Sequence, residues 1–281
     1  MSRRWQQVRH QLRRNRPAQF SLFVFFIFVI AALCAGLSPY DPDRMALGAR
    51  TLPPDAAHWF GTDEYGRDYF TRALYGGQIS LMVGFLAMLF STLIGTVVGT
   101  VSGYFGGWLD NLMMRAVDIL MAIPAFFLLL VVNAYLKPGV DNIILIISLL
   151  TWMNMSRLVR AETLSVKERE YVLYARASGE HPLRIIVRHI IPGVLPTIIV
   201  AATLNIASAI LMESTLSFLG LGVQAPAASW GSMLNNAQSY IGEASWLAMF
   251  PGILILLTVF SFNVLGDVFR TAFEPGANRD E

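Results

Sequence analysis

Six apolar stretches alternate with polar segments along this chain of 281 residues. They cover approximately residues 20–37, 79–101, 119–136, 143–159, 194–216 and 246–268. About 20 apolar residues in a helix cross a hydrocarbon layer roughly 30 Å thick, at about 1.5 Å per residue. Glycine, proline or a lone charge interrupts several stretches, which is tolerated where neighbouring helices bury the defect. The pattern predicts an all-α integral membrane protein with six transmembrane helices.

The composition supports this interpretation, because 55% of the residues are apolar, 14% are charged and the mean hydropathy is +0.53. Soluble domains have roughly 45–50% apolar and about 25% charged residues. No basic tract indicates a nucleic-acid partner. The single cysteine, Cys34, excludes an intrachain disulfide and a multi-cysteine metal site, and we interpret it as a small apolar residue of the first span.

The basic residues predict which side each loop occupies, because cytoplasmic loops of membrane proteins are enriched in Lys and Arg. With both termini inside the cell, 16 basic residues face the cytoplasm and five face outward. The predicted organisation is a basic cytoplasmic segment (1–19), a first span (20–37), an external loop (38–78), a five-helix core (79–268) and a cytoplasmic tail (269–281). The core contains a charged inner loop at 160–191.

The inner loop has the pattern of two helices joined at a glycine. A helix-compatible stretch from Lys167 closes at Gly179, which suits the left-handed position after a helix end. Pro182 fits the first turn of a second helix, which continues until Pro192 and Pro196 interrupt the next span. We call this helix–glycine–helix segment the elbow. Its first helix offers aromatic, small and Arg side chains, a mixture favoured at binding surfaces. Composition alone fits equally well a loop whose arginines contact anionic lipid.

The spacing of the elbow resembles a known motif. ABC import permeases carry an EAA loop, with the pattern Glu-Ala-Ala, three residues, Gly, nine residues, Ile, one residue and Leu-Pro. Gly179 and Pro192 keep this interval, and Ala175 is retained. The departures from the motif are Leu173, Tyr174, His189 and Ile191.

Five other segments resemble the same family in the same order along nearly the whole chain. They are Phe-Gly-Thr-Asp-Glu-Tyr-Gly-Arg-Asp at 60–68, the segment 103–118, Leu-Ser-Phe-Leu-Gly-Leu-Gly at 216–222, Trp-Gly at 230–231 and Phe-Asn-Val-Leu-Gly-Asp at 262–267. On these motifs the chain resembles the permease subunits of dipeptide, oligopeptide and nickel ABC importers of the bacterial inner membrane.

The resemblance implies the type I ABC importer permease fold and a set of partners. These are a second homologous permease, two cytoplasmic ABC ATPases and an external substrate-binding protein, with membrane lipid around the spans. The elbow is then expected to couple to an ATPase through Tyr171, Val172, Tyr174, Ala175, Arg176, Gly179 and Pro192. The outer segments are expected to form the platform for the binding protein, through Gly61, Thr62, Asp63, Gly66, Arg67, Asp68, Trp230 and Gly231.

The chain itself shows no nucleotide-binding loop, because neither of its two lysines follows the required glycine pattern. ATP is therefore expected on the partner subunits, with no catalytic residue, cofactor or metal on this chain. The expected cargo is di- or oligopeptides, with nickel, metal chelates or glutathione-like compounds as the alternative. A self-sufficient secondary transporter or a membrane-embedded enzyme would need none of these partners.

Two acidic residues in or near the spans are singled out, because charges inside a membrane are costly and often functional. Asp118 follows Arg115 by about one turn, which predicts a local ion pair. Glu213 lies near the outer end of the fifth span. It either bonds to a neighbouring helix or faces the translocation cavity, and the sequence leaves both open.

Overall fold

The computed structural model describes residues 2–135 and 139–273. Apart from one isolated bridge between Thr62 and Asp68, the regular structure of these residues is helical. The chain begins with the basic helix α1 (Ser2–Arg14) and the apolar helix α2 (Arg16–Leu33). Asn15 separates them, and its side chain accepts a hydrogen bond from the Ala18 amide at 3.3 Å. This cap begins α2, and α2 is followed by the 3₁₀ turn η1 (Ala35–Leu37).

The longest pairing in the fold joins α3 (Tyr69–Phe105) to α6 (Val140–Val166). Gly95, Gly99 and Gly103 of α3 recur at four-residue spacing and lie against α6. A methyl group on Gly99 would approach the Ser156 carbonyl oxygen to 2.5 Å, well inside van der Waals contact. Small residues at this spacing let two helix backbones pack closely, which is a main source of helix association in lipid.

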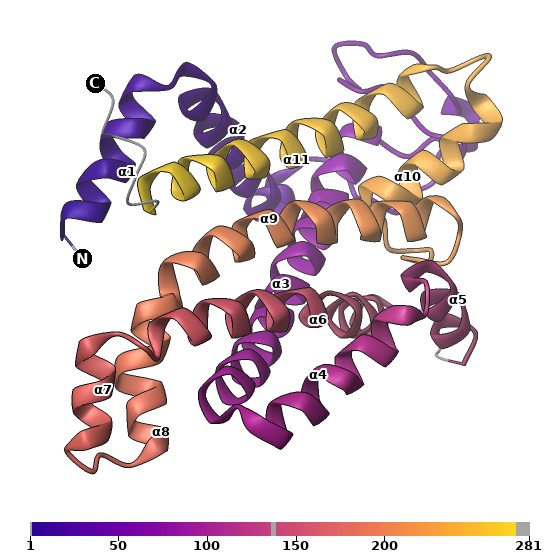
Figure 1. Ribbon diagram of the computed structural model, residues 1–281. Helices are drawn as coiled ribbons and strands as arrows, with labels where there is room; N and C mark the ends of the chain where they lie inside the picture. The colour runs from indigo at the N-terminus through magenta and orange to yellow at the C-terminus, as the bar shows by residue number, and fades with distance from the viewer. Residues whose placement is uncertain (1, 136–138, 274–281) are drawn as a thin grey trace.

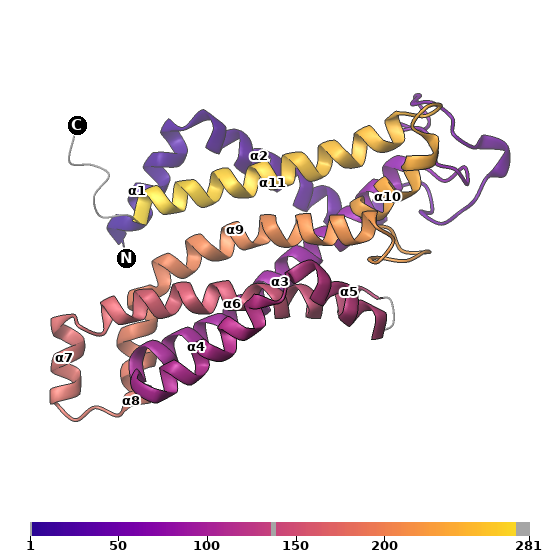
Figure 2. The same ribbon diagram turned by 45° about the vertical axis from the view of Figure 1, so that its right-hand side comes forward.

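Helices α9 (Ile191–Phe218), α11 (Trp246–Phe273) and α2 form a second layer, which α3 crosses (Figures 1 and 2). The helix α10 (Trp230–Ala237) caps this layer at one end, beside the loop that follows η1. That loop contains the short turn η2 (Leu47–Ala49), and η4 (Gln238–Tyr240) follows α10. At the opposite end lie α1, the last turns of α11 and the elbow. The start of the chain and the elbow therefore share one end of the molecule.

The predicted third span, 119–136, is not one straight helix. It is divided between α4 (Gly107–Ala122) and α5 (Ala125–Tyr135), whose described parts are bent by 85°, and residue 136 lies outside the described part of the chain. The break is at Ile123 and Pro124, and Ile123 is extended, with ψ of 123°. Proline lacks an amide hydrogen and disfavours helical geometry at the preceding residue, which explains the break.

The second elbow helix is also not separate from the fifth span. It begins as α8 (Pro182–Ile185), widens into a π-turn η3 (Ile186–Ile190) and continues as α9 without interruption. A π-turn shifts the hydrogen-bond register by one residue, and it occurs directly before Pro192, whose nitrogen carries no hydrogen. The helix therefore accommodates the proline that the sequence pattern marks as an interruption.

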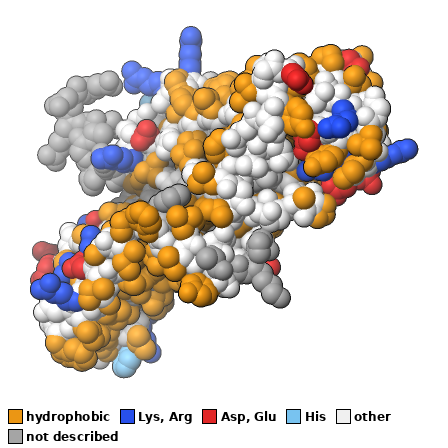
Figure 3. Space-filling view, turned by 90° about the vertical axis from the view of Figure 1, so that its right-hand side faces the viewer, with side chains coloured by type: hydrophobic (Ala, Val, Ile, Leu, Met, Phe, Trp, Pro, Cys, Tyr) orange, Lys and Arg blue, Asp and Glu red, His pale blue; other side chains and the backbone are white. Residues whose placement is uncertain are grey.

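Five of the six predicted spans are confirmed as long apolar helices among the described residues, and the bent pair α4–α5 makes a sixth candidate. Charged side chains gather toward both ends of the molecule, and the surface between them is mostly hydrophobic or uncharged (Figure 3). This distribution matches a protein that crosses a membrane along its long dimension.

Candidate functional site

The elbow begins with α7 (Glu170–Ala177), which ends in a hydrogen-bonded C-terminal cap. The Gly179 amide donates to the Arg176 carbonyl at 3.1 Å, and the Glu180 amide donates to the Ala175 carbonyl at 3.1 Å. This is the Schellman arrangement, and it requires the left-handed conformation that Gly179 adopts, with φ of +77°. The glycine of the motif-like spacing is thus needed to turn the chain from α7 into α8.

The two faces of α7 have different environments. Val172 and Ala175 are buried against apolar residues from α6, α8 and η3, among them Val166 and Ile190. Tyr171, Leu173 and Tyr174 are exposed, and Tyr174 is 76% exposed. Any partner that contacts α7 in this conformation therefore meets the tyrosines and Leu173, while Val172 and Ala175 hold the helix to the rest of the chain.

The elbow is also fixed to the C-terminal end of α3. The Arg176 guanidinium lies 5.3 Å from the centre of the Tyr104 ring, within the range of a cation–π contact. Lys167 donates to the Gly103 carbonyl at 3.0 Å, and His189 and Glu180 are 3.0 Å apart across the turn. Because both ends of the turn are attached, the elbow is positioned to move together with α3 and α9. Pro192 lies at the start of α9 rather than on the exposed face of α7.

At the other end of the molecule, residues 61–68 form a compact loop around Asp63. Its carboxylate accepts hydrogen bonds from the amides of Tyr65 and Arg67, both at 2.9 Å, and from Nε of Arg67 at 2.6 Å. Nε of Arg72, at the start of α3, is 3.6 Å from the same carboxylate. These buried charges stay paired, as the low dielectric of a protein interior requires.

Trp230 and Gly231 lie where α10 packs against α3 and α9. The Trp230 indole donates to the Ala73 carbonyl of α3 at 2.9 Å. A methyl group on Gly231 would approach the backbone of Ser214 to 2.6 Å. Both residues therefore hold α10 in close contact with the spans.

All eight residues predicted for the external platform are buried in this structure. They are Gly61, Thr62, Asp63, Gly66, Arg67, Asp68, Trp230 and Gly231. Their side chains and backbones shape the outer segments, and exposed neighbours such as Tyr65 and Trp59 form the surface. The sequence pattern therefore marks residues that build the fold of these segments, and the exposed surface is provided by their neighbours.

Glu213 is fully buried in α9 and is surrounded by serines. Its carboxylate accepts hydrogen bonds from Ser80 of α3 at 3.0 Å and from Ser217 at 2.7 Å. Ser80 in turn accepts from the Trp230 amide at 3.2 Å. Of the two settings left open by the sequence, the structure shows bonding to a neighbouring helix. The carboxylate joins α9, α3 and the start of α10.

The predicted ion pair between Asp118 and Arg115 is wrong. Asp118 instead pairs with Arg157 of α6, because the bend at Pro124 leaves α4 alongside that helix. A second pair, Asp110 with Arg160, lies two turns earlier on α4. Sequence spacing indicates ion pairs only within one helix. It therefore does not indicate the two ion pairs between α4 and α6.

Among the residues that the structure describes, no three His, Cys, Asp or Glu side chains are grouped so that they would hold a metal ion. The features missed from the sequence are the helix α1, the Glu213–serine network and the ion pairs between α4 and α6. The basic residues of α1 indicate only the orientation of the chain. The helix itself is indicated by Val8 and Leu12, which recur at helical spacing and pack against Val268 and Ala272 of α11.

Comparison with known proteins gives matches along nearly the whole chain. Residues 91–279 match the family described as binding-protein-dependent transport system inner membrane component, and residues 3–54 match the N-terminal TM domain of oligopeptide transport permease C. The dipeptide transport system permease protein DppC of Bacillus subtilis is 42% identical over 96% of this chain and 85% of its own length. The oligopeptide transport system permease protein OppC of Escherichia coli is 41% identical over 96% of this chain and 91% of its own length.

A solved structure supports the fold. The MetNI methionine ABC transporter, in inward-facing conformations, matches with a TM-score of 0.59 and 20% sequence identity, covering 71% of this chain and 95% of that chain. At this identity the likeness concerns the fold alone. The chain belongs to the family of binding-protein-dependent transport system inner membrane components, the multi-pass permeases of ABC importers, and is a transport component of such a system rather than an enzyme.

Proposed function

We propose that this chain is the permease subunit of an ATP-driven importer of dipeptides or oligopeptides and forms half of the translocation pathway. The observation that carries the proposal is the identity of about 40% to dipeptide and oligopeptide permeases over nearly the full chain. The fold likeness to the methionine ABC transporter agrees with a permease fold. Nickel, metal chelates or glutathione-like compounds are the alternative cargo of similar permeases.

The proposed complex contains a second homologous permease, two cytoplasmic ATPases that bind the ATP, and an external substrate-binding protein. In the proposed orientation, α1, the end of α11 and the elbow face the cytoplasm, while α10 and the loop after η1 face outward. The grouping of these elements at opposite ends of the molecule supports this orientation (Figure 2). The excess of basic residues on the elbow side supports it independently.

The elbow is proposed to dock in a groove of an ATPase through the exposed side of α7. A short helix seated in a groove transmits a rigid displacement, provided that it is firmly attached at its own base. Val172 and Ala175 supply that attachment, the partly exposed Tyr171 lies with its ring centre 6.4 Å from that of His189, and Tyr174 faces away from the attachment. Movement of the ATPases on nucleotide binding would then displace α7, α3 and α9 together.

The coupling proposal is tested by Tyr174→Ala in the reconstituted complex, with substrate-stimulated ATP hydrolysis and uptake as readouts. We expect both to fall by roughly fivefold or more, since an exposed tyrosine at an interface is often a main binding contact. Tyr135→Ala is the matched control, because Tyr135 is an exposed tyrosine at the end of α5 and lies away from the elbow. Stimulation and uptake unchanged by Tyr174→Ala would contradict the proposed docking face.

The cargo is tested separately, on the external binding protein that works with this permease. Calorimetric titration with di- and oligopeptides, Ni²⁺ chelates and glutathione compares the candidates directly. Tight binding of peptides, followed by peptide uptake into vesicles that contain the whole complex, is the expected result. Binding of Ni²⁺ chelates or glutathione without peptide binding would replace peptides by the alternative cargo.

A further inference from the structure

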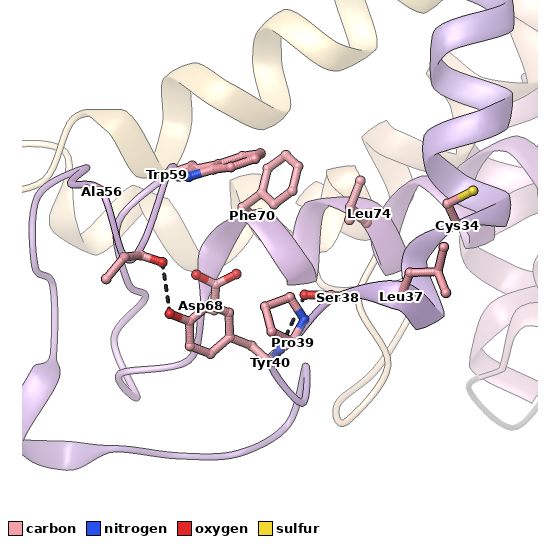
Figure 4. A pocket seen from close by; sticks show the side chains of 11 residues that line it. Cys34, Leu37, Ser38, Pro39, Tyr40, Ala56, Trp59, Asp68, Phe70 and Leu74 are labelled. Atoms are coloured by element: carbon pink, nitrogen blue, oxygen red, sulfur yellow. Dashed lines mark hydrogen bonds between the residues drawn. The ribbon is translucent and has the colours of Figure 1, made fainter.

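A cavity of about 430 Å³ lies at the outer end of the molecule, apart from the elbow and the Glu213 network. It lies between η1, the loop that follows it and the first two turns of α3. In Figure 4 the Asp68 carboxylate lies between the ring of Tyr40 and the rings of Trp59 and Phe70, while Leu37 lies on the other side of the cavity. The walls thus combine three aromatic rings, aliphatic side chains and one carboxylate.

The depth of this cavity in the membrane follows from a contact between α2 and α3. The Gln78 side chain donates to the Ala32 carbonyl at 2.7 Å, which places the end of α2 level with the start of the apolar run of α3 at residue 79. Leu74 and Phe70 lie one and two turns farther out, at about 6 and 12 Å. The head-group layer extends roughly 5–8 Å beyond the hydrocarbon on each side. The cavity therefore begins at the level of the lipid head groups.

The opening of the cavity is continuous with the apolar exterior of α2. Phe26, Ile30 and Leu33 are exposed along that helix, and Leu37 of η1 extends the exposed surface to the cavity wall. Trp59 is 65% exposed at the outer side. Exposed aromatic residues at this depth are typical of the membrane interface, where one side of the ring is apolar and the other is hydrated.

The polar chemistry of the cavity selects a cation. Oδ2 of Asp68 accepts from the amide of Thr71 at 2.7 Å and from its hydroxyl at 2.6 Å, and Oδ1 is 2.8 Å from Nδ1 of His58. A carboxylate has about four acceptor sites, so one remains. Aromatic faces also attract ammonium groups, so the rings and the carboxylate favour the same ligand.

We propose that this cavity binds the amine head group of an outer-leaflet phospholipid. The ammonium group lies against Asp68 and the rings of Tyr40 and Trp59, and the acyl chains follow Leu37 and Leu33 onto the exterior of α2. A purely apolar occupant would leave the negative charge and the remaining acceptor site of the carboxylate unmatched, and an anionic head group would be repelled by it. An amine lipid satisfies the carboxylate, the rings and the continuous apolar path together.

Native mass spectrometry of the delipidated full chain tests the proposal. The protein is titrated with phosphatidylethanolamine or with phosphatidylglycerol of the same acyl chains. We expect one phosphatidylethanolamine to be retained with roughly fivefold or greater preference, the size expected for one cation–π contact together with the carboxylate. Equal retention of the two lipids by the wild-type chain would overturn the proposal.

Variants locate the site. Trp59→Leu removes an exposed ring, and Asp68→Asn removes the charge while asparagine can still cap α3. Both are expected to lower phosphatidylethanolamine retention to the level of phosphatidylglycerol. Tyr40→Phe keeps the ring and is expected to bind like the wild type. Trp108→Leu, which changes an exposed tryptophan of α4 at the other end, is the matched control. Unchanged lipid preference in Trp59→Leu and Asp68→Asn would overturn the site.

A soluble competitor separates the lipid from other amines. Dialanine, which carries a free amino terminus, is added to the protein loaded with phosphatidylethanolamine. Retention of the lipid is the expected result, because the acyl chains contribute to its binding along α2. Displacement by millimolar dialanine would overturn the lipid assignment and identify the cavity as a peptide amine site. The outcome does not depend on transport, so it stands or falls separately from the proposed function.

Discussion

Arg160 of α6 donates two hydrogen bonds of 2.6 Å, from Nε and Nη2, to the two carboxylate oxygens of Asp110 in α4. Such paired bonds fix orientation as well as distance. Asp110 is buried, whereas the neighbouring pair of Arg157 and Asp118 is about half exposed. The bent helix α4 is therefore held to α6 by one sheltered and one exposed ion pair.

The two pairs predict different losses of stability. Asp110→Asn removes the charge from the sheltered pair and is expected to cost about 1.5–3 kcal/mol, the range for a hydrogen bond to a charged group. Arg157→Ala, the control in the exposed pair, is expected to cost at most about 1 kcal/mol. Thermal unfolding of the purified chain in detergent measures both. Equal shifts in melting temperature would contradict the distinction.

The glycine face of α3 gives a second stability prediction. Gly99→Ala is expected to lower the melting temperature, because the added methyl group would meet the Ser156 carbonyl and α3 would separate from α6. Overpacking of this kind costs roughly 1–3 kcal/mol. Gly252→Ala in α11 is the control, since no atom lies within 4 Å of the added carbon. Alanine favours a helix over glycine, so the control is expected to be neutral or stabilising.

Two substitutions of Glu213 distinguish a structural role, bonding to a neighbouring helix, from a role in the translocation cavity. Glu213→Gln can still bond to Ser80 and Ser217, so assembly and uptake of cationic peptides are expected to remain near the wild-type level. Glu213→Leu leaves the hydroxyl hydrogens of these buried serines without their acceptor and is expected to cost about 1–3 kcal/mol per unsatisfied donor. Melting temperature and uptake are measured for both variants. Loss of cationic-peptide uptake in a stable Glu213→Gln complex would assign the carboxylate to the translocation cavity.

The outer loop gives a prediction for pH. Burial raises the pKa of Glu64 above its ordinary value of about 4.5, and the neighbouring charge of Asp63 adds to the rise, against the opposing effects of a backbone hydrogen bond, Arg67 and Arg72. The folded state therefore binds this proton more tightly than the unfolded state. The proton on Glu64 therefore stabilises the folded state fully below about pH 4.5. This stabilisation is lost as the pH rises through the raised pKa of Glu64.

Glu64→Gln is expected to remove this part of the pH dependence. Melting temperatures between about pH 4 and pH 8 should decline less steeply in the variant than in the wild type. Glu243 is exposed at the same end of the molecule, so Glu243→Gln is the control for the loss of a carboxylate at another position. If the melting temperature of Glu64→Gln declined with pH as steeply as that of the wild type, the pH dependence would belong to other groups.

The sequence predicted those elements that are determined by residues close together in the chain. Apolar length alone identified five spans, and Gly179 marked the end of α7 because its left-handed geometry is a property of one residue. The predicted third span is bent rather than straight for a specific reason. The stretch 119–136 is apolar throughout, and hydropathy does not register that Pro124 bends the chain.

Burial of the patterned segments was not predictable in the same way. Asp63, Arg67 and Asp68 are charged and lie in a loop, so the sequence favoured exposure for them, yet they pair with one another, with Thr71 or with His58 and are buried. Pairing across an irregular loop depends on its three-dimensional path, which no periodicity records. The same holds for Glu213, whose partner Ser80 is 133 residues away.

The continuity of α8, η3 and α9 joins the two ends of the molecule through a single helical backbone. These elements form one continuous helical segment of 37 residues, which bends between α8 and the main part of α9 (Figure 2). The segment runs from the elbow to the Glu213 carboxylate, which is linked to the start of α10 through Ser80. A displacement of the elbow would therefore be passed along one unbroken backbone to the hydrogen bonds that hold α10.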